Sequence, residues 1–226
     1  MPTNPPALSL HHVSRPPRVA PPPGTKPPLL LLLHGVGADE HDLLGLAPPL
    51  DGRFHVVSAR APLSHGAGFG WYPVQFTPTG IVPDETVAVQ SRDTLAAFVP
   101  EAVAAYDLDP RRVFLAGFSQ GAIMSLTLAL HTPELVAGVA AMSGRLLDVA
   151  WDERASDERL SGFPILAVHG LYDTVLPIAE GRRIRNELTK LPLTFAYHEY
   201  PMAHEISQES LAEVAGFLTG RLNAGE

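Results

Sequence analysis

The chain has 226 residues, of which 46% are hydrophobic and 18% are charged, and it carries 16 Lys and Arg residues against 24 Asp and Glu residues. This length and composition predict a single domain with a sizeable core and exclude a globally disordered chain. The net charge of −8 disfavours nucleic acid and anionic membrane surfaces as partners, because like charges repel. The chain contains no cysteine, which excludes disulfides, thiolate metal sites and a cysteine nucleophile.

Residues 1–28 form a proline-rich arm ahead of the main domain, which we place at residues 29–226. Within the arm, residues 7–13 are long enough for one edge strand, and the prolines at 21–23 predict an extended linker. No segment approaches the roughly 20 consecutive apolar residues that span a bilayer. The start also lacks the basic and then apolar pattern of a secretory signal. We therefore expect a cytoplasmic protein without a membrane span.

From residue 29 onward, strand-like and helix-like segments alternate. Short apolar runs predict buried strands at residues 29–33, 54–58, 112–116, 136–142, 165–168 and 194–200. Longer segments predict helices at residues 84–106, 120–131, 177–190 and 205–222. Strands that are apolar throughout and alternate with helices indicate a mostly parallel, twisted sheet with helices on both faces. The predicted fold class is therefore α/β.

The segments between these elements carry separate expectations. Residues 39–47 form an amphipathic stretch, and residues 59–83 are expected to be a long loop rich in glycine, proline and aromatic residues. Asp84 is expected to cap the helix that follows it, and we expect this helix to bend or break before Pro100. Residues 144–162 are the only stretch large enough for a cap, but they are few and charged, so no large cap is expected.

The clearest chemical signal is the sequence Gly-Phe-Ser-Gln-Gly at residues 117–121. It lies between a predicted strand and a predicted helix, where a sharp turn would project Ser119 from the end of the sheet. Glycines two positions to either side remove the Cβ atoms that would collide with such a turn. The helix start supplies free N–H groups that favour negative charge. This context favours Ser119 as a nucleophile over an incidental serine in a glycine-rich connection.

A serine hydroxyl needs a base within hydrogen-bonding distance, and the chain offers ten histidines. We select His204, because it lies between the last predicted strand and the last helix and satisfies the chain order of nucleophile, acid and histidine. His198 lies inside a strand, and His131 ends a helix, where a cation suits the helix dipole. Five further histidines have no motif around them and are interpreted as surface or structural residues: His11, His12, His41, His55 and His65.

The third expected member is an acid that orients the histidine and stabilises its charged form. Asp173 follows the predicted strand at 165–168 and the turn after it, so it lies at the carboxyl end of a strand, as ligand sites in such sheets do. The competing aspartates belong to a charged segment that is typical of a solvated helix or loop: Asp148, Asp152 and Asp157. We therefore assign the acid to Asp173.

An oxyanion hole is expected where the strand at 29–33 runs into the sequence His-Gly-Val-Gly at residues 34–37. The expected donors are the backbone amides of Val36 and Gln120, and each such donor typically contributes about 3 kcal/mol to the transition state. His34 and His169, each followed by glycine, are interpreted as structural rings. A metal site that combines these two histidines with the acid and the base matches no ligand spacing, so no metal is expected.

Several blocks together resemble the carboxylesterase/phospholipase branch of the α/β-hydrolase superfamily, which includes acyl-protein thioesterases and small bacterial carboxylesterases. The blocks are residues 33–37, 117–122, 141–144, 169–173 with Pro177, and 204–205. The resemblance implies an α/β-hydrolase fold with Ser119 as nucleophile, His204 as base and Asp173 as orienting acid. It also implies the amides of Val36 and Gln120 as the oxyanion hole, and neither a metal nor an organic cofactor.

The predicted loop at 59–83 carries four aromatic residues, namely Phe69, Trp71, Tyr72 and Phe76. These residues either wall an acyl or aryl group or pack the loop onto the sheet. Trp71 and Leu176 are the expected substrate-binding residues. Because the candidate cap is short, we expect an open groove that accepts small to medium esters.

These observations predict a serine carboxylesterase that acts on small-molecule esters through an acyl-enzyme intermediate. An acyl-protein thioesterase or a lysophospholipase is the alternative function. A non-catalytic binding protein of the same fold is the third hypothesis. It is disfavoured because such proteins usually lose a member of the catalytic triad, whereas this chain holds all three residues. A homodimer is left open.

Overall fold

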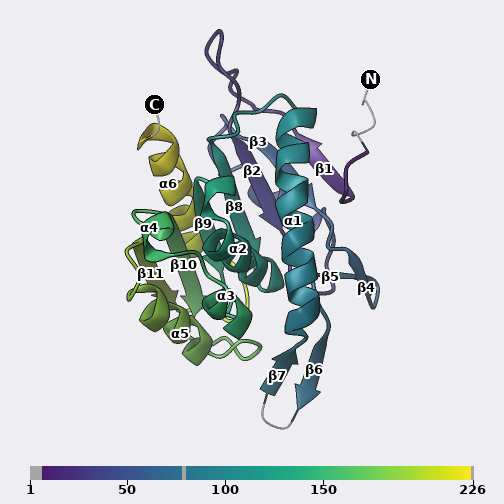
Figure 1. The fold of residues 1–226 in the computed structure, drawn as a ribbon, viewed down its shortest axis with the longest axis vertical. Helices are drawn as coiled ribbons and strands as arrows, with labels where there is room; N and C mark the ends of the chain where they lie inside the picture. The colour runs from purple at the N-terminus through teal and green to yellow at the C-terminus, as the bar shows by residue number, and fades with distance from the viewer. Residues whose placement is uncertain (1–6, 78–79, 225–226) are drawn as a thin grey trace.

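The computed structural model describes residues 7–77 and 80–224 and is built around one seven-stranded sheet (Figure 1). Its strand order is β1-β3-β2-β8-β9-β10-β11, and every neighbouring pair is parallel except β1 with β3. The strands are β1 His12–Arg15, β2 Leu29–Leu33, β3 His55–Ala59, β8 Val113–Phe118, β9 Gly138–Met142, β10 Pro164–Gly170 and β11 Thr194–Tyr200. The predicted α/β class with a mostly parallel sheet is confirmed.

Helices cover both faces of this sheet. One face carries α1 Glu85–Ala105, α2 Gln120–His131, α3 Asp148–Asp152, α4 Asp157–Leu160 and α5 Ile178–Leu188, with the short 3-10 helix η2 Pro133–Leu135. The other face carries the 3-10 helix η1 Asp42–Leu46 and α6 Gln208–Ala224. None of the helices in the described part of the chain is long and apolar enough to cross a membrane.

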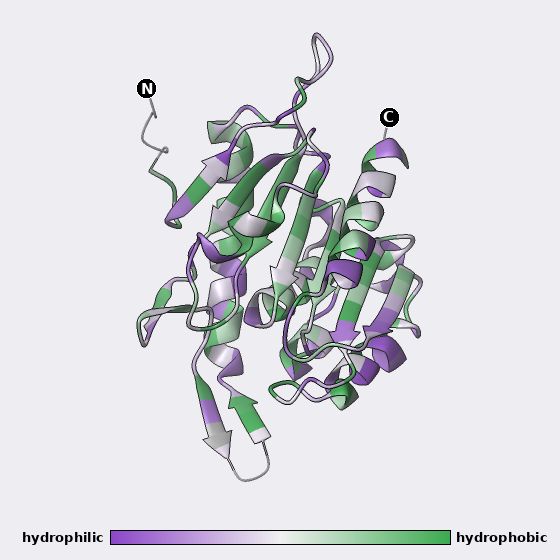
Figure 2. Ribbon diagram, turned by 180° about the vertical axis from the view of Figure 1, so that it is seen from behind, coloured by the Kyte–Doolittle hydropathy of each residue, from purple (hydrophilic) through white to green (hydrophobic). Residues whose placement is uncertain are grey.

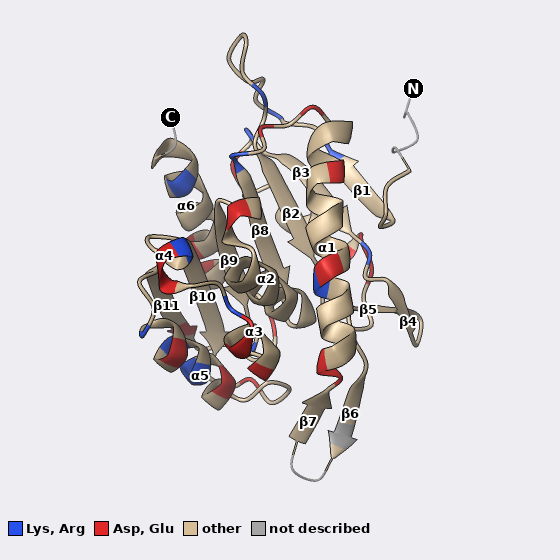
Figure 3. Cartoon of the chain, in the orientation of Figure 1, with Lys and Arg blue, Asp and Glu red and all other residues tan. Residues whose placement is uncertain are grey.

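The five leucines of β2 explain why the sheet lies between two cores. Side chains alternate between the faces of a strand, so Leu29, Leu31 and Leu33 pack into the core beneath α1 and α2. Leu30 and Leu32 pack into the second core beneath η1 and α6. All five are buried, and Figure 2 shows hydrophobic residues concentrated along the strands. Figure 3 correspondingly shows charged residues on helices and loops around an almost uncharged sheet.

The segment expected to be a long loop forms two small antiparallel hairpins. The first pairs β4 Leu63–His65 with β5 Gly68–Gly70, and the second pairs β6 Val74–Thr77 with β7 Gly80–Pro83. The turn of the first hairpin contains Gly66, which has a φ of +60°. Glycine adopts such a positive φ without steric cost because it has no Cβ. In Figure 1 the second hairpin projects beyond the carboxyl ends of the parallel strands. Its turn, residues 78–79, lies outside the described residues.

Two further elements differ from their predicted form. Helix α1 begins after Asp84, whose side chain accepts from the Val87 amide as expected, but the helix continues through Pro100 without a break. Burial of its Leu95 and Phe98 in the core holds the helix where the proline removes one hydrogen bond. The edge strand lies at His12–Arg15 rather than at 7–13 and pairs antiparallel with β3.

The strand order predicts a ligand-binding site at the carboxyl ends of the central strands β2 and β8. The chain passes from β2 to β3 on one side, whereas β8 joins β2 on the other side. In open α/β sheets, ligands bind outside the carboxyl ends of the strands at such a reversal. The loops that follow β2 and β8 leave the sheet at this point, and they contain Val36 and Ser119.

His55 is expected to make the fold sensitive to acid. The ring is buried in β3 and stacks on Tyr106 at 4.6 Å between centroids, and burial lowers the pKa of His55 below its ordinary value of 6.5. The unfolded chain then binds a proton more readily than the folded chain, so stability falls as the pH falls through about 6.5. Urea unfolding at a series of pH values should show this loss. His55→Phe keeps an aromatic ring and should lose less stability over the same window; an equal slope in both proteins would contradict the assignment.

Candidate active site

Ser119 lies on a strained turn between β8 and α2. It has a φ of +54°, which is uncommon for a residue with a side chain. Its amide donates to the carbonyl of Met142 at 2.9 Å, and its own carbonyl accepts from the Ile123 amide at 3.1 Å. The turn is therefore anchored to β9 on one side and to the first turn of α2 on the other.

The flanking glycines are required by close backbone contacts. A Cβ atom at Gly117 would lie 2.2 Å from the carbonyl oxygen of Gly121, and one at Gly121 would lie 1.8 Å from the carbonyl oxygen of Leu33. A Cβ at Gly35 would lie 3.3 Å from the Cβ of Ser119. The start of α2 thus presses against the end of β2, which explains the Gly-x-Ser-x-Gly spacing in steric terms.

The structure brings His204 and Asp173 together with Ser119. Nε2 of His204 lies 2.9 Å from Oγ of Ser119, and Nδ1 lies 2.7 Å from Oδ2 of Asp173. Nδ1–H of His204 donates a hydrogen bond to the carboxylate, and in this tautomer Nε2 carries no hydrogen and can accept from the serine hydroxyl. The carboxyl group is fully buried, whereas the imidazole keeps 15% of its side-chain surface exposed. The imidazole of His204 is therefore held by a buried carboxylate on one side and is partly exposed to solvent on the other.

Asp173 is fixed by its own loop after β10. Its Oδ1 accepts from the amides of Val175 and Leu176 at 2.9 and 2.8 Å, which leaves Oδ2 for His204. His169 donates from Nε2 to the carbonyl of Leu176 at 2.8 Å and so closes the same loop. His169 is thus placed as a structural ring, and Leu176 is buried with its backbone committed to holding the acid.

The loops of the acid and the histidine also contact each other. A Cβ atom at Gly170 would lie 2.3 Å from the carbonyl oxygen of Ala203, beside His204. Tyr172, next to Asp173, donates its amide to the carbonyl of Met202 at 3.0 Å. Two loops from neighbouring parallel strands therefore fix one another, and with them the pair of His204 and Asp173.

The backbone amides of Val36 and Gln120 belong to the two segments that meet at Ser119, because a Cβ on Gly35 would lie 3.3 Å from the Cβ of Ser119. Gln120 is the first residue of α2, where N–H groups have no partner within the helix. Neither amide donates to a backbone acceptor in the part of the chain that the structure describes. The turn that holds Val36 is fixed instead by the amide of Gly37, which donates to the carbonyl of Phe69 on β5 at 2.7 Å. Both amides are thus available to a ligand atom beside Ser119.

The side chain of Gln120 joins this turn to the first hairpin, a role that sequence reasoning missed. Its Oε1 accepts from the amide of Trp71 at 2.9 Å, and its Nε2 donates to the carbonyl of Tyr72 at 2.8 Å. Both partners lie about 50 positions earlier in the chain, so no local pattern could have indicated the pairing.

Trp71 occupies a different place from the expected wall of the groove. Its side chain is fully buried, and its indole N–H donates to the carbonyl of His34 at 3.0 Å. It therefore has no exposed surface with which to contact substrate, and it supports the turn that carries Val36. Tyr72 is likewise buried, while the side chain of Phe76 lies outside the described residues.

His34 supports the same turn as a neutral ring. Its Nε2 accepts from the amide of Ala61 at 3.0 Å, so its Nδ1 carries the hydrogen and donates to the carbonyl of Gly35 at 2.7 Å. Burial lowers the pKa of His34, which keeps the ring uncharged as this pattern requires. The sequence interpretation of His34 as a ring beneath the turn agrees with this placement.

The competing residues lie elsewhere. His198 approaches Glu213 at 3.6 Å, and His131 bonds to the carbonyl of Glu153 at 2.9 Å. Asp148 pairs with Arg183 on α5. No group of three His, Asp or Glu side chains within the described ranges is arranged to hold a metal ion.

A mostly parallel sheet with helices on both faces, and a serine, histidine and aspartate at its carboxyl edge, define an α/β-hydrolase. Residues 15–221 match the model of the Phospholipase/Carboxylesterase family, and the chain belongs to this family. It is accordingly a carboxylesterase-like hydrolase that acts on ester bonds.

Individual relatives agree with this membership. The chain is 27% identical to esterase PE8, with a TM-score of 0.80 over 93% of this chain and 98% of that one. The Bacillus cereus carboxylesterase shares the fold, with a TM-score of 0.78, 21% identity and 94% of each chain covered. The chain is also 26% identical to acyl-protein thioesterase 1 of Debaryomyces hansenii over 163 residues, which cover 70% of both chains.

Gly121→Ala tests the steric basis of the turn at Ser119. Because the added methyl group would overlap the carbonyl of Leu33, we expect a loss of about 3 kcal/mol in the free energy of unfolding and a loss of esterase activity. Gly216→Ala is the matched control, since its Cβ would meet no atom within 4 Å and should stabilise helix α6 slightly. Urea unfolding and ester hydrolysis measure both effects, and a fully active, stable Gly121→Ala protein would refute the argument.

Proposed function

We propose that the protein hydrolyses carboxylic esters with Ser119 as nucleophile, His204 as general base and acid, and Asp173 as the orienting acid. The observation that carries this proposal is the unbroken pair of hydrogen bonds at 2.9 and 2.7 Å that joins the three side chains. A serine hydroxyl on a strained turn beside an unprotonated imidazole nitrogen is the arrangement that nucleophilic acyl transfer requires.

In the first half-reaction, Oγ of Ser119 attacks the carbonyl carbon of the ester while its proton passes to Nε2 of His204. The carbonyl electrons move onto oxygen, and the resulting oxyanion accepts hydrogen bonds from the amides of Val36 and Gln120. Each amide is expected to stabilise this state by about 3 kcal/mol. Collapse of the intermediate breaks the ester bond, and His204 gives its proton to the departing alcohol.

In the second half-reaction, water replaces the alcohol. It loses a proton to His204 and attacks the acyl group on Ser119, so the same two amides again meet an oxyanion. The carboxylic acid leaves, and the proton returns from His204 to Ser119. Asp173 stays ionised throughout and stabilises the imidazolium that forms in each half.

We propose small to medium acyl esters as substrates, because little of the chain is available to cover the site. The segment 144–162 forms α3 and α4, which pack on the helical layer against α1, α2 and η2. Exposed apolar side chains occupy the loops that carry the acid and the oxyanion amide, namely Val36, Leu171, Tyr172 and Val175. We propose these residues as the apolar rim of the groove, with Leu176 behind them.

A larger acyl donor is the second candidate, favoured by the same exposed rim and by the relative named acyl-protein thioesterase 1. The two candidates differ in the acyl chain that the groove accepts. If the first holds, the specificity constant kcat/KM on p-nitrophenyl esters should peak at acetate to hexanoate and fall for palmitate. A maximum at palmitate, together with faster hydrolysis of palmitoyl thioesters, would favour the second candidate instead.

The role of Ser119 is tested directly by chemistry at its hydroxyl. A fluorophosphonate should label the Ser119 peptide in mass spectrometry, and Ser119→Ala should lose both labelling and esterase turnover while it folds normally by circular dichroism. Labelling at another residue, or turnover above a trace in Ser119→Ala, would show that the nucleophile is misassigned.

Asp173→Asn separates orientation from nucleophilicity. The amide can present an N–H to His204 and so favour the wrong imidazole tautomer, which we expect to lower kcat by about 10⁴-fold. Glu205→Gln is the control: it changes a nearby carboxylate that is not hydrogen-bonded to Ser119 or His204, and it should change kcat little. A small effect of Asp173→Asn would contradict the assigned role.

Two expectations concern the whole protein rather than its site. We propose a cytoplasmic location, which subcellular fractionation tests, and a homodimer, which light scattering of the purified chain tests.

A further inference from the structure

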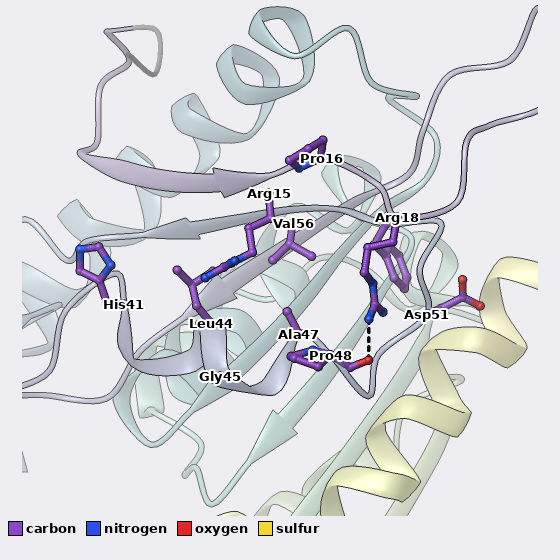
Figure 4. A pocket seen from close by; sticks show the side chains of 11 residues that line it. Arg15, Pro16, Arg18, His41, Leu44, Gly45, Ala47, Pro48, Asp51 and Val56 are labelled. Carbon is purple, nitrogen blue, oxygen red and sulfur yellow. Dashed lines mark hydrogen bonds between the residues drawn. The ribbon is translucent and has the colours of Figure 1, made fainter. Parts of the chain in front are cut away.

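A cavity beside β1 and η1 lies apart from Ser119, and Figure 4 shows the side chains that line it. It has a volume of about 560 Å³, is open to solvent on one side, and is lined by residues of β1, the start of β3, η1 and the loop that follows η1. Arg15 pairs with Val56 near the amino end of β3, whereas Ser119 follows the carboxyl end of β8. This volume falls within the range of small-molecule sites, and the cavity shares no residue with the site described above.

The floor of this cavity is apolar. Leu44, Phe54 and Val56 line it and belong to the core between the sheet and α6. Pro16 and Pro48 add further apolar surface from either side. A hydrocarbon chain that binds here would gain about 25 cal/mol of favourable free energy for each Å² of apolar surface that it removes from water.

The rim of the cavity is cationic. Arg15 extends from β1 toward Leu44 in Figure 4, and its guanidinium has no hydrogen-bond or ion-pair partner in the described chain. Arg18 donates to the carbonyl of Pro48 at 2.7 Å and to that of Leu50. Because both acceptors are neutral carbonyls, the positive charge of Arg18 is not cancelled by them.

The one carboxylate in the lining is already neutralised. Asp51 accepts hydrogen bonds from the guanidinium of Arg53 at 3.0 and 2.8 Å and from its backbone amide at 2.9 Å, and these bonds lower the pKa of Asp51. In Figure 4 its carboxylate points away from Arg15. A cavity with two arginines and a neutralised acid is thus electropositive in a chain whose net charge is −8.

We propose that this cavity binds an amphipathic carboxylate. Its hydrocarbon chain packs on Leu44 and Phe54, and its carboxylate pairs with Arg15 in the field of Arg18. Guanidinium groups suit carboxylates because their donors match the two oxygens. A neutral molecule of the same shape would fill the floor but would leave the charge at the rim unpaired.

Two substitutions separate the parts of this proposal. Arg15→Gln removes the unpartnered charge from an exposed side chain, so it should not disturb the fold. Gly45 also lines the cavity, and a Cβ there would meet no atom within 4 Å. Gly45→Phe should therefore fill the cavity with its ring. Arg111→Gln removes an equal charge from a side chain that is 88% exposed elsewhere and is the matched control.

Isothermal titration of the full chain with octanoate, and with octanol as the neutral comparison, tests the proposal. We expect saturable binding of octanoate, tighter than that of octanol. The Kd for octanoate should rise about threefold to tenfold in Arg15→Gln. Gly45→Phe should show no measurable binding of octanoate. In Arg111→Gln the Kd should stay unchanged.

Three results would overturn the proposal. The first is no saturable binding of octanoate to the unaltered chain. The second is binding that persists in Gly45→Phe, which would place the ligand elsewhere, such as the groove beside Ser119. The third is an unchanged Kd in Arg15→Gln, which would leave an apolar cavity without selectivity for anions. Arg15→Gln decides the class of ligand even if Gly45→Phe fails to fold.

Discussion

The contact between the start of α2 and the end of β2 is the constraint on which the site depends. Because Gly121 has no Cβ, the first turn of α2 lies directly against the carbonyl of Leu33. Ser119, two residues before Gly121, has a positive φ, and Gln120 between them is the first residue of α2. Ser119 and the amide of Gln120, which we propose as nucleophile and oxyanion donor, are thus held next to one backbone contact between α2 and β2.

Two further sets of contacts hold the remaining groups. The loops after β10 and β11 fix each other at Gly170, which places Asp173 under His204. On the other side, Gln120 and the buried indole of Trp71 hold the segment after the first hairpin against the start of α2 and the turn that carries Val36. The proposed reacting groups are therefore held by backbone contacts and buried partners, as preorganised electrostatic stabilisation requires, while the imidazole of His204 keeps 15% of its side-chain surface exposed.

The sequence predicted those features that local patterns determine. The apolar runs indicated six strands of the sheet, and the Gly-x-Ser-x-Gly spacing between a strand and a helix indicated Ser119, although the contact that requires Gly121 is with the distant Leu33. The hairpins between residues 63 and 83 were missed, since glycine and proline there resemble an unstructured loop. Trp71 was expected at the groove, but it is buried by partners 37 and 49 positions away. Long-range contacts of this kind leave no periodic signal in the chain.

The sheet register has a practical consequence for anyone who engineers this scaffold. The loops of the site leave strands β2, β8, β10 and β11, which are far apart in the chain but aligned residue by residue in space. A slip of one residue in any pair would turn its side chains to the opposite face and separate these loops. Colour release from a chromogenic ester by the purified chain therefore reports correct assembly of the entire framework, so variants altered far from Ser119 can be tested for folding by their activity.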